Sequence, residues 1–519
     1  MSCHQLSFNV KILSNLFFIS IKFTAFKIGF FGVLKHFLLP KRMEDYEEIK
    51  KLLEENNQAH VLKYWNELSE EQQKEFLLHL KSFNFKDACM LWDKIQENEK
   101  TDKEDNNDIL PVEAQVEKDF SNDDIEEYRT VGLEEIGNGK VAVIVLAGGQ
   151  GTRLGMSYPK GMCPTGIPSG KTLFQLQAER ILRLQEIVKE RIGKESIIYW
   201  YFMTSEPTHM LTEKFLEQNQ YFKLKKENVK LFKQGLVPCF DMEGKFILEE
   251  KDGIALSPDG NGGLYKALKQ HGILDDMDEK GIKFVHVHSV DNILIKVADP
   301  VFIGKCIKDK VDCGFKVIKK IDPNEPLGVV VRVNNKLKVV EYSELPINMA
   351  TLEHPSGNGL LFNSGNICNH FFTVDFLKLI VDEHEKDLKV HRANKIITQI
   401  GPDGDKIRPI QPNCIKVEKF IFDVISYSQN FLAWQTERVE EFSPIKNSDL
   451  SKKDCFNTAK IDLLSLHKSW VEKKGGICKG IGLEVSPLAS YGGEGLEFVK
   501  GKEFCEEDVI FSKAEKQNS

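Results

Sequence analysis

The chain has 519 residues, of which 41% are hydrophobic and 29% charged, and its formal net charge is −8. This length exceeds what one simple hydrophobic core organises, so roughly two to four domains are expected. The negative balance argues against a general nucleic-acid-binding surface, while a local basic pocket for a small anion stays compatible with it. The 11 cysteines form no C-x-x-C pair, which favours reduced thiols over a disulfide framework or a zinc site.

The first 42 residues differ from the rest of the chain. They are rich in phenylalanine and lysine and contain no acidic residue before Glu44. Lys22 and Lys27 interrupt the apolar run, so no stretch of about 20 apolar residues is available to span a membrane. The same lysines, and the lack of a small-residue cleavage site, weaken a secretory signal. We interpret 1–42 as a disordered or non-native extension, with the working protein starting near Met43.

An N-terminal helical domain and its linker are expected over 43–135. The apolar spacing after Glu44 is helical, and Ser69 followed by Gln72 is typical of a capping box. The segment 97–124 is rich in Asp, Glu, Asn and Lys and indicates an exposed linker. No chemistry is predicted for this region.

The most informative stretch starts with Val141–Leu146, a β-branched apolar run typical of a buried parallel strand. Three glycines and two cations follow at once: Gly148, Gly149, Gly151, Arg153 and Lys160. Glycines allow a close approach of the backbone to a ligand, and free N–H groups in such a loop bind phosphate oxygens. A nucleotide-phosphate loop is therefore predicted.

The downstream pattern alternates between helix and strand. Helices are predicted over 172–190 and 208–218, and strands over 197–203, 229–232 and 284–290. A second glycine-rich loop, 259–263, opens a helix at Leu264, and Asp291 ends the last of these strands. The alternation indicates a doubly wound α/β domain over 136–414, with ligands at the carboxyl ends of its strands.

Later elements are expected to be less regular. Asn334-Asn335 predicts a hairpin turn, and 360–362 predicts a strand leading into a loop at 363–366. A helix carrying Lys416 is predicted over 415–427, opening a smaller α+β C-terminal domain over 415–519. His286 and His288 share one face of their strand, and core packing is favoured over a metal site because no third ligand is suggested.

Two general phosphate-binding motifs fail on spacing. A P-loop needs four residues between its glycines, whereas Gly166 and Gly170 enclose three before Lys171. Lys171-Thr172 is therefore interpreted as a helix start. A dinucleotide motif beginning at Gly149 has Leu154 where the last glycine belongs.

A third motif accounts for more of the chain. L-A-G-G-Q-G-T-R-L-G at 146–155, followed by Y-P-K-G-M at 158–162, resembles the eukaryotic UDP-N-acetylhexosamine (UDP-N-acetylglucosamine) pyrophosphorylases, within the UDP-sugar pyrophosphorylase family. Further blocks resemble that family in the same order: 234–235, 258–263, 290–292, 340–343, 362–366, 415–420 and 442–447. The resemblance covers the chain from about Glu44 onward. It implies a Rossmann-like, GT-A-like nucleotidyltransferase domain between the helical and C-terminal domains.

The resemblance also implies a cytoplasmic enzyme that joins UTP to N-acetylglucosamine 1-phosphate and releases pyrophosphate. It assigns catalytic roles to Arg153, Lys160 and Lys446. It assigns UTP binding to Leu146, Ala147, Gly148, Gly149, Gly151, Gln234, Gly260, Asp291 and Lys416. It assigns sugar binding to Asn261, Glu341 and Asn366, and Mg²⁺ to the reaction, with Asp291 as the candidate ligand.

The chemistry suits these residue types. An oxygen of the sugar phosphate attacks the α-phosphorus in line, so catalysis requires positioning and charge neutralisation rather than a protein nucleophile. N-acetylgalactosamine 1-phosphate stays open as a second acceptor, as does the oligomeric state. The alternatives are a UDP-glucose or broad UDP-sugar pyrophosphorylase and, from another class, a non-catalytic nucleotide-binding scaffold. Neither nucleic acid nor membrane is expected as a partner.

Overall fold

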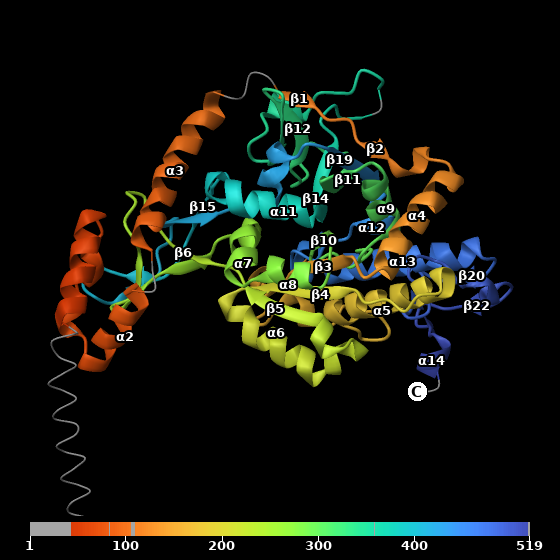
Figure 1. The fold of residues 1–519 in the computed structure, drawn as a ribbon, viewed down its shortest axis with the longest axis horizontal. Helices are drawn as coiled ribbons and strands as arrows, with labels where there is room; N and C mark the ends of the chain where they lie inside the picture. Colours follow the sequence, from red (N-terminus) through yellow and green to blue (C-terminus); the bar gives the residue numbers. More distant parts are fainter. Residues whose placement is uncertain (1–42, 82–83, 105–108, 358, 517–519) are drawn as a thin grey trace, which may run out of the picture. The chain divides into compact units, whose positions relative to one another are not determined.

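The computed structural model describes residues 43–81, 84–104, 109–357 and 359–516 (Figure 1). The predicted extension 1–42 lies outside these ranges. Within them, none of the helices combines the length and apolar character that crossing a bilayer demands.

Contacts between residues group the chain into two compact units. The first contains residues 43–94, Pro238–Ser257 and Arg392–Lys416, and the second contains Ile95–Val237, Pro258–His391 and the remainder from Val417. The predicted division into 43–135, 136–414 and 415–519 stays a prediction. The compact units follow different boundaries because two later segments pack with the N-terminal helices.

The first unit combines helices with short β-segments. Its elements are a helix over 43–55, η1 (Ala59–Leu62), η2 (Trp65–Glu67), α2 (Glu70–Lys81), the start of α3 (Phe85–Glu104), β7 (Leu248–Glu250), β8 (Gly253–Ile254), β16 (Gln399–Ile400) and β17 (Lys406–Ile407). The predicted capping box is confirmed, because Ser69 and Gln72 exchange hydrogen bonds of 3.1 and 3.3 Å. The side chain of Gln58 bonds the backbone of Gly244 and Phe246, which joins the helices to a later segment of the chain.

An 11-stranded mixed sheet forms the centre of the second unit (Figure 1). Its main path runs β2 (Gln115–Val116), β19 (Phe431–Thr436), β11 (Cys313–Lys319), β14 (Ser364–Thr373), β10 (Phe284–Ser289), β3 (Val141–Leu146), β4 (Tyr199–Thr204) and β5 (Val229–Lys233). On this path only β14 runs antiparallel to its neighbours. A branch of β1 (Ile109–Pro111), β12 (Val329–Val333) and β13 (Lys336–Val340) joins at β14.

Helices cover both faces of this sheet. Val141, Val143 and Val145 of β3 share one core with α4 (Asn122–Gly137), α5 (Leu173–Ile192) and α9 (Pro300–Lys308). The alternate residues of β3 share the opposite core with α7 (Leu264–Gln270), α8 (Ile273–Glu279) and α11 (Val374–Leu379). A strand buried on both faces is expected to be apolar throughout, which explains the composition of β3. Two further helices of this part of the chain are α6 (Glu206–Gln218) and α10 (Ile347–Ala350).

Eight short strands, two short helices and one long helix, α13, are also described. They are β6 (Leu236–Pro238), β9 (Leu256–Pro258), β15 (His391–Lys395), β18 (Cys414–Glu418), α12 (Arg438–Glu441), α13 (Phe456–Lys473), β20 (Ile477–Cys478), β21 (Glu484–Val485), β22 (Glu503–Phe504), β23 (Val509–Ile510) and α14 (Lys513–Lys516). In the C-terminal part, β20 pairs with β22 and β21 pairs with β23, in both cases parallel.

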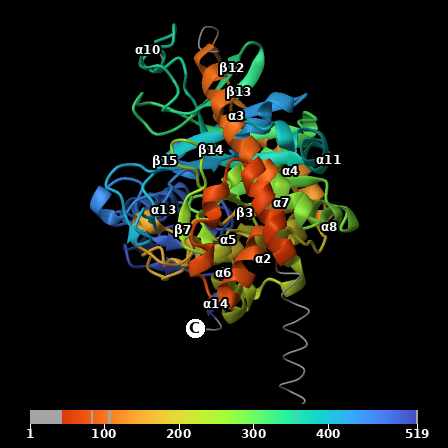
Figure 2. The same cartoon turned by 90° about the vertical axis from the view of Figure 1, so that its left-hand side faces the viewer.

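Several local predictions are confirmed and three are wrong. The segment 97–124, predicted as an exposed linker, contains the strands β1 and β2, which pair within the main sheet. The turn at Asn334-Asn335 joins β12 to β13, with φ of 50° and 63°, as a two-residue hairpin turn requires (Figure 2). The predicted helix over 415–427 is instead the strand β18 followed by a 3-10 helix, Ile421–Tyr427. Buried and half-buried residues alternate along β18, a period of two that the helical prediction missed. The strand predicted at 360–362 starts later, since β14 takes up the residues predicted as a loop.

His286 and His288 lie in the core, as predicted. Nδ1 of His286 accepts the Ala298 N–H at 3.1 Å, so its Nε2 carries the proton and donates to Asn369 at 2.7 Å. Burial lowers the pKa of His286 to about 4, and it lowers the pKa values of His288, His370 and His467 to about 3. All four are therefore neutral in the folded chain at neutral pH.

Stability is expected to fall when the pH drops below about 6.5. Above this pH the four histidines are neutral in both the folded and the unfolded chain. Below it they are protonated in the unfolded chain but stay neutral in the folded chain, which lowers the free energy of unfolding by about 1.4 kcal/mol per pH unit for each histidine. Thermal unfolding at pH 7.5 and 5.5 measures the loss. His370→Leu should reduce the acid-induced loss, because neither ring nitrogen of His370 has a hydrogen-bond partner. An equal loss in the variant would contradict this assignment.

Candidate functional site

The glycine-rich loop leaves the carboxyl end of β3, where the sheet geometry predicts a ligand site. Leu146 and Ala147 are buried at the end of the strand, and Gly151 has φ of 66°, a conformation that favours glycine. Among described residues, no acceptor is bonded to the N–H groups of Gly148 or Gly149. These N–H groups are therefore available to an anion.

Gln234 follows β5 and lies against this loop. A Cβ built on Gly148 would lie 2.4 Å from Oε1 of Gln234, so the amide and the loop backbone are packed together. The backbone N–H of Gln234 is fixed by a 2.8 Å bond to Thr204, and the hydroxyl of Ser205 donates to the Gly148 carbonyl at 2.7 Å. The ends of β4 and β5 thus position the loop that leaves β3.

Gly148→Ala is expected to weaken nucleotide binding about tenfold or more, because the added methyl must displace either Gln234 or the loop. Gly492→Ala is the control, since nothing lies within 4 Å of a Cβ at that position and Gly492 is not one of the predicted site residues. Binding of UTP to each variant, measured by calorimetry, provides the comparison. Equal weakening in both variants would contradict the role of the Gly148 contact.

Two lysines and a carboxylate converge at the carboxyl end of β10. Nζ of Lys160 lies 3.1 Å from Oδ2 of Asp291 and also donates to the Ile445 carbonyl at 3.2 Å. Burial opposes ionisation of Asp291, but the charges of Lys160 and Lys446 outweigh it and lower the pKa of this carboxyl. Asp291 is therefore an anion held between two cations that come from distant parts of the chain.

Backbone pairing brings Lys446 to Asp291. The N–H of Ile445 donates to the Asp291 carbonyl at 2.9 Å, and Asn292 forms an isolated β-bridge with Pro444. The side chain of Asn292 donates to the Glu441 carbonyl at 2.6 Å and accepts the Ser443 N–H at 3.0 Å. The two segments are thus fastened together on both sides of the charged cluster.

The second glycine-rich loop surrounds a buried carboxylate. Asp259 is 6% exposed, its Oδ1 has no hydrogen-bond partner, and burial raises its pKa to about 7. A Cβ on Gly235 or Gly263 would lie 2.6 or 1.9 Å from its oxygens, so both glycines are needed for space. Gly260, with φ of 87°, similarly packs against the Lys419 backbone.

The predicted sugar-binding residues lie in different settings. Oδ1 of Asn261 already accepts the Ile421 N–H at 3.0 Å, whereas Oδ1 of Asn366 is buried without a partner. Burial and the charge of Glu344 raise the pKa of Glu341, while Lys446 lowers it, so Glu341 lies within reach of the charged cluster. Asn366 therefore offers an acceptor oxygen that has no other partner among the described residues.

The described contacts give no support to the predicted roles of Arg153 and Lys416. Arg153 is exposed, and none of the residues described in the structure forms an ion pair with it. Lys416 lies on β18 in the first unit, whereas the cluster belongs to the second. Their predicted roles stay predictions.

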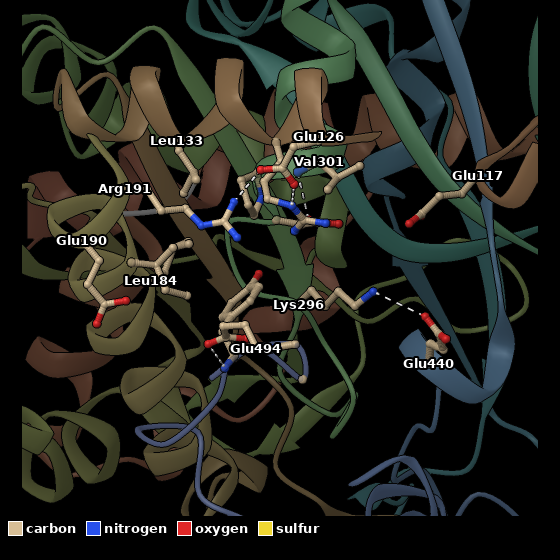
Figure 3. A pocket seen from close by; sticks show the side chains of 17 residues that line it. Glu117, Glu126, Leu133, Leu184, Glu190, Arg191, Lys296, Val301, Glu440 and Glu494 are labelled. Carbon is tan, nitrogen blue, oxygen red and sulfur yellow. Dashed lines mark hydrogen bonds and ion pairs between the residues drawn. The ribbon is translucent and has the colours of Figure 1, made fainter. Parts of the chain in front are cut away.

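A cavity of about 390 Å³ lies elsewhere in the second unit (Figure 3). It is lined by residues of α4, α5, α9 and the segment 491–494, and it contains none of the predicted site residues. Its charges pair with one another, for example Arg191 with Glu126 at 2.5 Å and Lys296 with Glu440 at 3.8 Å. These internal pairs leave little charge for a ligand.

Three residues around the cluster carry no sequence motif that predicts their contacts. Ser205 bonds the loop, Ser289 donates to Asp291 at 2.8 Å, and Glu441 accepts from Asn292. Ser205 and Ser289 each lie at the carboxyl end of a parallel strand, a position that could have identified them. No comparable position at the end of a strand would have identified Glu441.

Together these features describe an α/β protein in which a glycine-rich loop leads to a charged cluster of Lys160, Asp291 and Lys446. The sequence profile of the UTP–glucose-1-phosphate uridylyltransferases matches residues 83–477, and the chain belongs to this family.

Individual relatives support the resemblance noted in the sequence. The chain is 42% identical over 492 residues to UDP-N-acetylhexosamine pyrophosphorylase-like protein 1 of Xenopus tropicalis, covering 89% of this chain and 95% of that protein. It is 40% identical over 480 residues to the UDP-N-acetylglucosamine pyrophosphorylase of Saccharomyces cerevisiae, covering 90% and 100%. The crystal structure of the Trypanosoma brucei UDP-N-acetylglucosamine pyrophosphorylase with an inhibitor matches with a TM-score of 0.77 at 28% identity, covering 91% and 99%.

Proposed function

We propose that this chain is a uridylyltransferase that makes UDP-N-acetylglucosamine and pyrophosphate from UTP and N-acetylglucosamine 1-phosphate. The observation that carries the proposal is the cluster of Lys160, Asp291 and Lys446 at the end of the glycine-rich loop. The names of the relatives from Xenopus and yeast support the N-acetylated sugar.

The proposed reaction needs no covalent intermediate. An oxygen of the sugar phosphate forms a bond to the α-phosphorus of UTP, and the bond from that phosphorus to the bridging oxygen breaks, so that oxygen leaves with pyrophosphate. The N–H groups of Gly148, Gly149 and Gly151 would hold the phosphates, and Arg153, Lys160 and Lys446 would neutralise charge on the leaving group. In the same scheme, Gln234 contacts the uracil edge and Lys416 a phosphate.

Sugar recognition is assigned to polar groups beside the cluster. The unpartnered Oδ1 of Asn366 can accept the acetamido N–H of the sugar, and Glu341 can accept a sugar hydroxyl. Gly260 and Asn261 complete the contacts to the uridine and the sugar. N-acetylgalactosamine 1-phosphate differs at one hydroxyl and is a second acceptor to assay.

Mg²⁺ fits this site if the substrate supplies most of its ligands. Asp291 offers two carboxylate oxygens, and no group of three metal-binding side chains occurs among the described residues. Mg²⁺ commonly binds one carboxylate together with phosphates and water. When bound, the ion supplies further positive charge to the triphosphate.

The proposed function also includes a domain architecture and a cytoplasmic location. The helices on both faces of the parallel strands fit a doubly wound, GT-A-like nucleotidyltransferase domain between an N-terminal helical domain and a smaller α+β C-terminal domain. The ten cysteines that the structure describes are free thiols, which fits a cytoplasmic protein.

Release of pyrophosphate from UTP tests the proposal directly. Full-length protein is assayed with Mg²⁺ and either N-acetylglucosamine 1-phosphate or glucose 1-phosphate, and a strong preference for the former is expected. Preference for glucose 1-phosphate would favour a UDP-glucose enzyme, as the name of the family suggests. Absence of release with both acceptors would favour a nucleotide-binding scaffold.

A further inference from the structure

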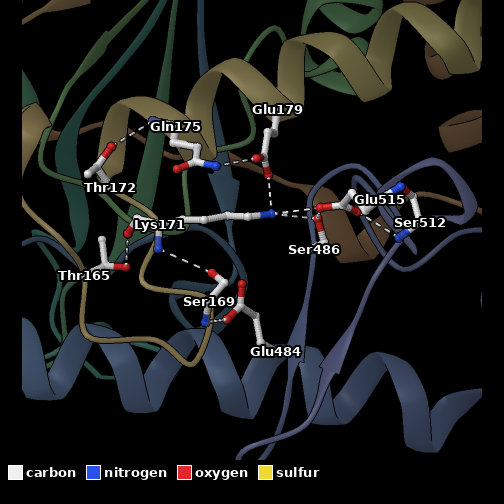
Figure 4. A network of polar contacts seen from close by, with 10 residues as sticks. All are labelled: Thr165, Ser169, Lys171, Thr172, Gln175, Glu179, Glu484, Ser486, Ser512 and Glu515. Carbon is white, nitrogen blue, oxygen red and sulfur yellow. Dashed lines mark hydrogen bonds and ion pairs between the residues drawn. The ribbon is translucent and has the colours of Figure 1, made fainter. Parts of the chain in front are cut away.

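Lys171, which no predicted function accounts for, lies in a buried polar network that includes the C-terminal tail (Figure 4). It is 6% exposed, and its Nζ donates to Glu179 at 2.7 Å, to the Ser486 hydroxyl at 2.9 Å and to Glu515 at 3.1 Å. Glu179 belongs to α5, Ser486 directly follows β21, and Glu515 belongs to α14. One ammonium group thus joins three elements that are far apart in the sequence.

Glu515 is ordered by its own surroundings. Its carboxylate accepts the Ser486 hydroxyl at 2.7 Å and the Ser512 N–H at 2.8 Å, and its own N–H donates to Ser512 Oγ at 3.2 Å. Burial opposes its ionisation, but these hydrogen bonds and the charge of Lys171 lower the pKa of Glu515. Burial raises the pKa of Glu179, the other carboxylate that pairs with Lys171.

A second contact ties the same loop to the same C-terminal strand. The N–H of Ser169 donates to Glu484 Oε2 at 2.8 Å. Glu484 lies on β21, which pairs with β23 immediately before the tail. The loop before α5 is therefore held by the C-terminal segment at Glu484, Ser486 and Glu515.

This loop also supports Lys160. The carbonyl of Lys171 accepts both the N–H and the hydroxyl of Thr165, at 3.1 and 2.8 Å, which closes the loop on itself. The N–H of Cys163 then donates to the Lys160 carbonyl at 3.0 Å. Gly161, next to Lys160, packs so tightly on α5 that a Cβ there would lie 2.1 Å from the Phe174 ring.

From this chain of contacts we propose that the C-terminal tail, through Glu515 and Lys171, positions Lys160 for uridylyl transfer. Glu515 and Lys171 are positioning residues, because they act through the loop and do not reach the charged cluster themselves. The inference rests on the proposed function for its catalytic consequence, whereas the structural coupling between the tail and the loop is independent of it.

The test compares two truncations of the full chain. Ending the chain after Phe511 removes Ser512 and Glu515, whereas ending it after Lys516 retains both and removes only 517–519. The shorter protein is expected to lose about 10- to 100-fold in kcat, with a smaller change in KM for the sugar phosphate, and the longer one to match the full chain. Glu515→Ala should reproduce part of the loss, and Lys513→Ala, an exposed lysine on the same turn, should not.

Two further measurements separate positioning from a general loss of stability. In a Lys160→Ala background the shorter truncation should cost no further activity, because the tail acts through that lysine. Hydrogen exchange of the segment 160–172 should be at least about tenfold faster in the shorter protein, with exchange in β3 unchanged.

Two results would overturn the proposed positioning of Lys160 by the tail. Full activity together with unchanged exchange after removal of 512–519 overturns the proposal, as does an additive loss in the Lys160→Ala background. If the full chain shows no uridylyl transfer, the proposed function fails. The hydrogen-exchange measurement then decides the coupling between the tail and the loop. Unchanged exchange overturns this coupling, and faster exchange at 160–172 supports it.

Discussion

Lys160→Ala is expected to slow uridylyl transfer by about 10²–10³-fold while the chain stays folded. Lys160 pairs with Asp291 at 3.1 Å, and its side chain is 17% exposed, so it can reach a phosphate while staying anchored. Without it, charge that develops on the leaving pyrophosphate loses a preorganised cation. Asp291 would keep the hydroxyl of Ser289 and the nearby charge of Lys446, which is why the fold should survive.

The measurement is kcat for pyrophosphate release at saturating UTP, together with the midpoint of thermal unfolding. Lys189→Ala is the matched control, because Lys189 is an exposed lysine on α5 that pairs only with Glu195 at the surface. Near-normal turnover of Lys160→Ala would remove Lys160 from the catalytic role. A large decrease in the midpoint of thermal unfolding would show that the ion pair of Lys160 with Asp291 is chiefly structural.

The largest effect on stability is expected from Lys316→Met, which should cost about 3–5 kcal/mol. Lys316 is fully buried, and its Nζ donates to the carboxylates of Asp299 and Glu441. The charges of Lys316 and Lys296 keep the pKa of Asp299 at about 2 despite its burial, so removing one lysine leaves excess negative charge in the core. The backbone carbonyl of Glu441 also accepts a hydrogen bond from Asn292, next to Asp291, so a displacement of Glu441 should reach the site.

The free energy of unfolding in urea measures this cost, with Lys226→Met, an exposed partner of Glu217, as the control of unchanged stability. Combining Lys316→Met with Asp299→Asn and Glu441→Gln should recover part of the loss, because the carboxylates left without a counter-ion become neutral. Asn at 299 can still cap α9, as Asp299 does for the Val301 N–H. Wild-type stability of the single variant would contradict the network's role.

The family was predicted from the sequence because the motif blocks are specific for it. This specificity does not depend on knowing how the blocks are arranged in space. The functional roles of loop residues such as Gly148 and Lys160 were predicted in the same way. The prediction failed for 415–427, where alternating burial along β18 overrode an apparent helical pattern. Periodicity over such a short apolar run does not distinguish a helix from a strand.

By itself, the sequence determined what depends on neighbouring residues. The buried strand Val141–Leu146, the glycine-rich loop after it and the turn at Asn334-Asn335 follow from side-chain period and backbone sterics over a few residues. Only the tertiary structure decided the pairing of Lys160 with Asp291, 131 residues away, and the place of Lys171 between α5 and the C-terminal tail. Such pairs depend on how strands are ordered in the sheet and on desolvation in the core, and no local pattern encodes either.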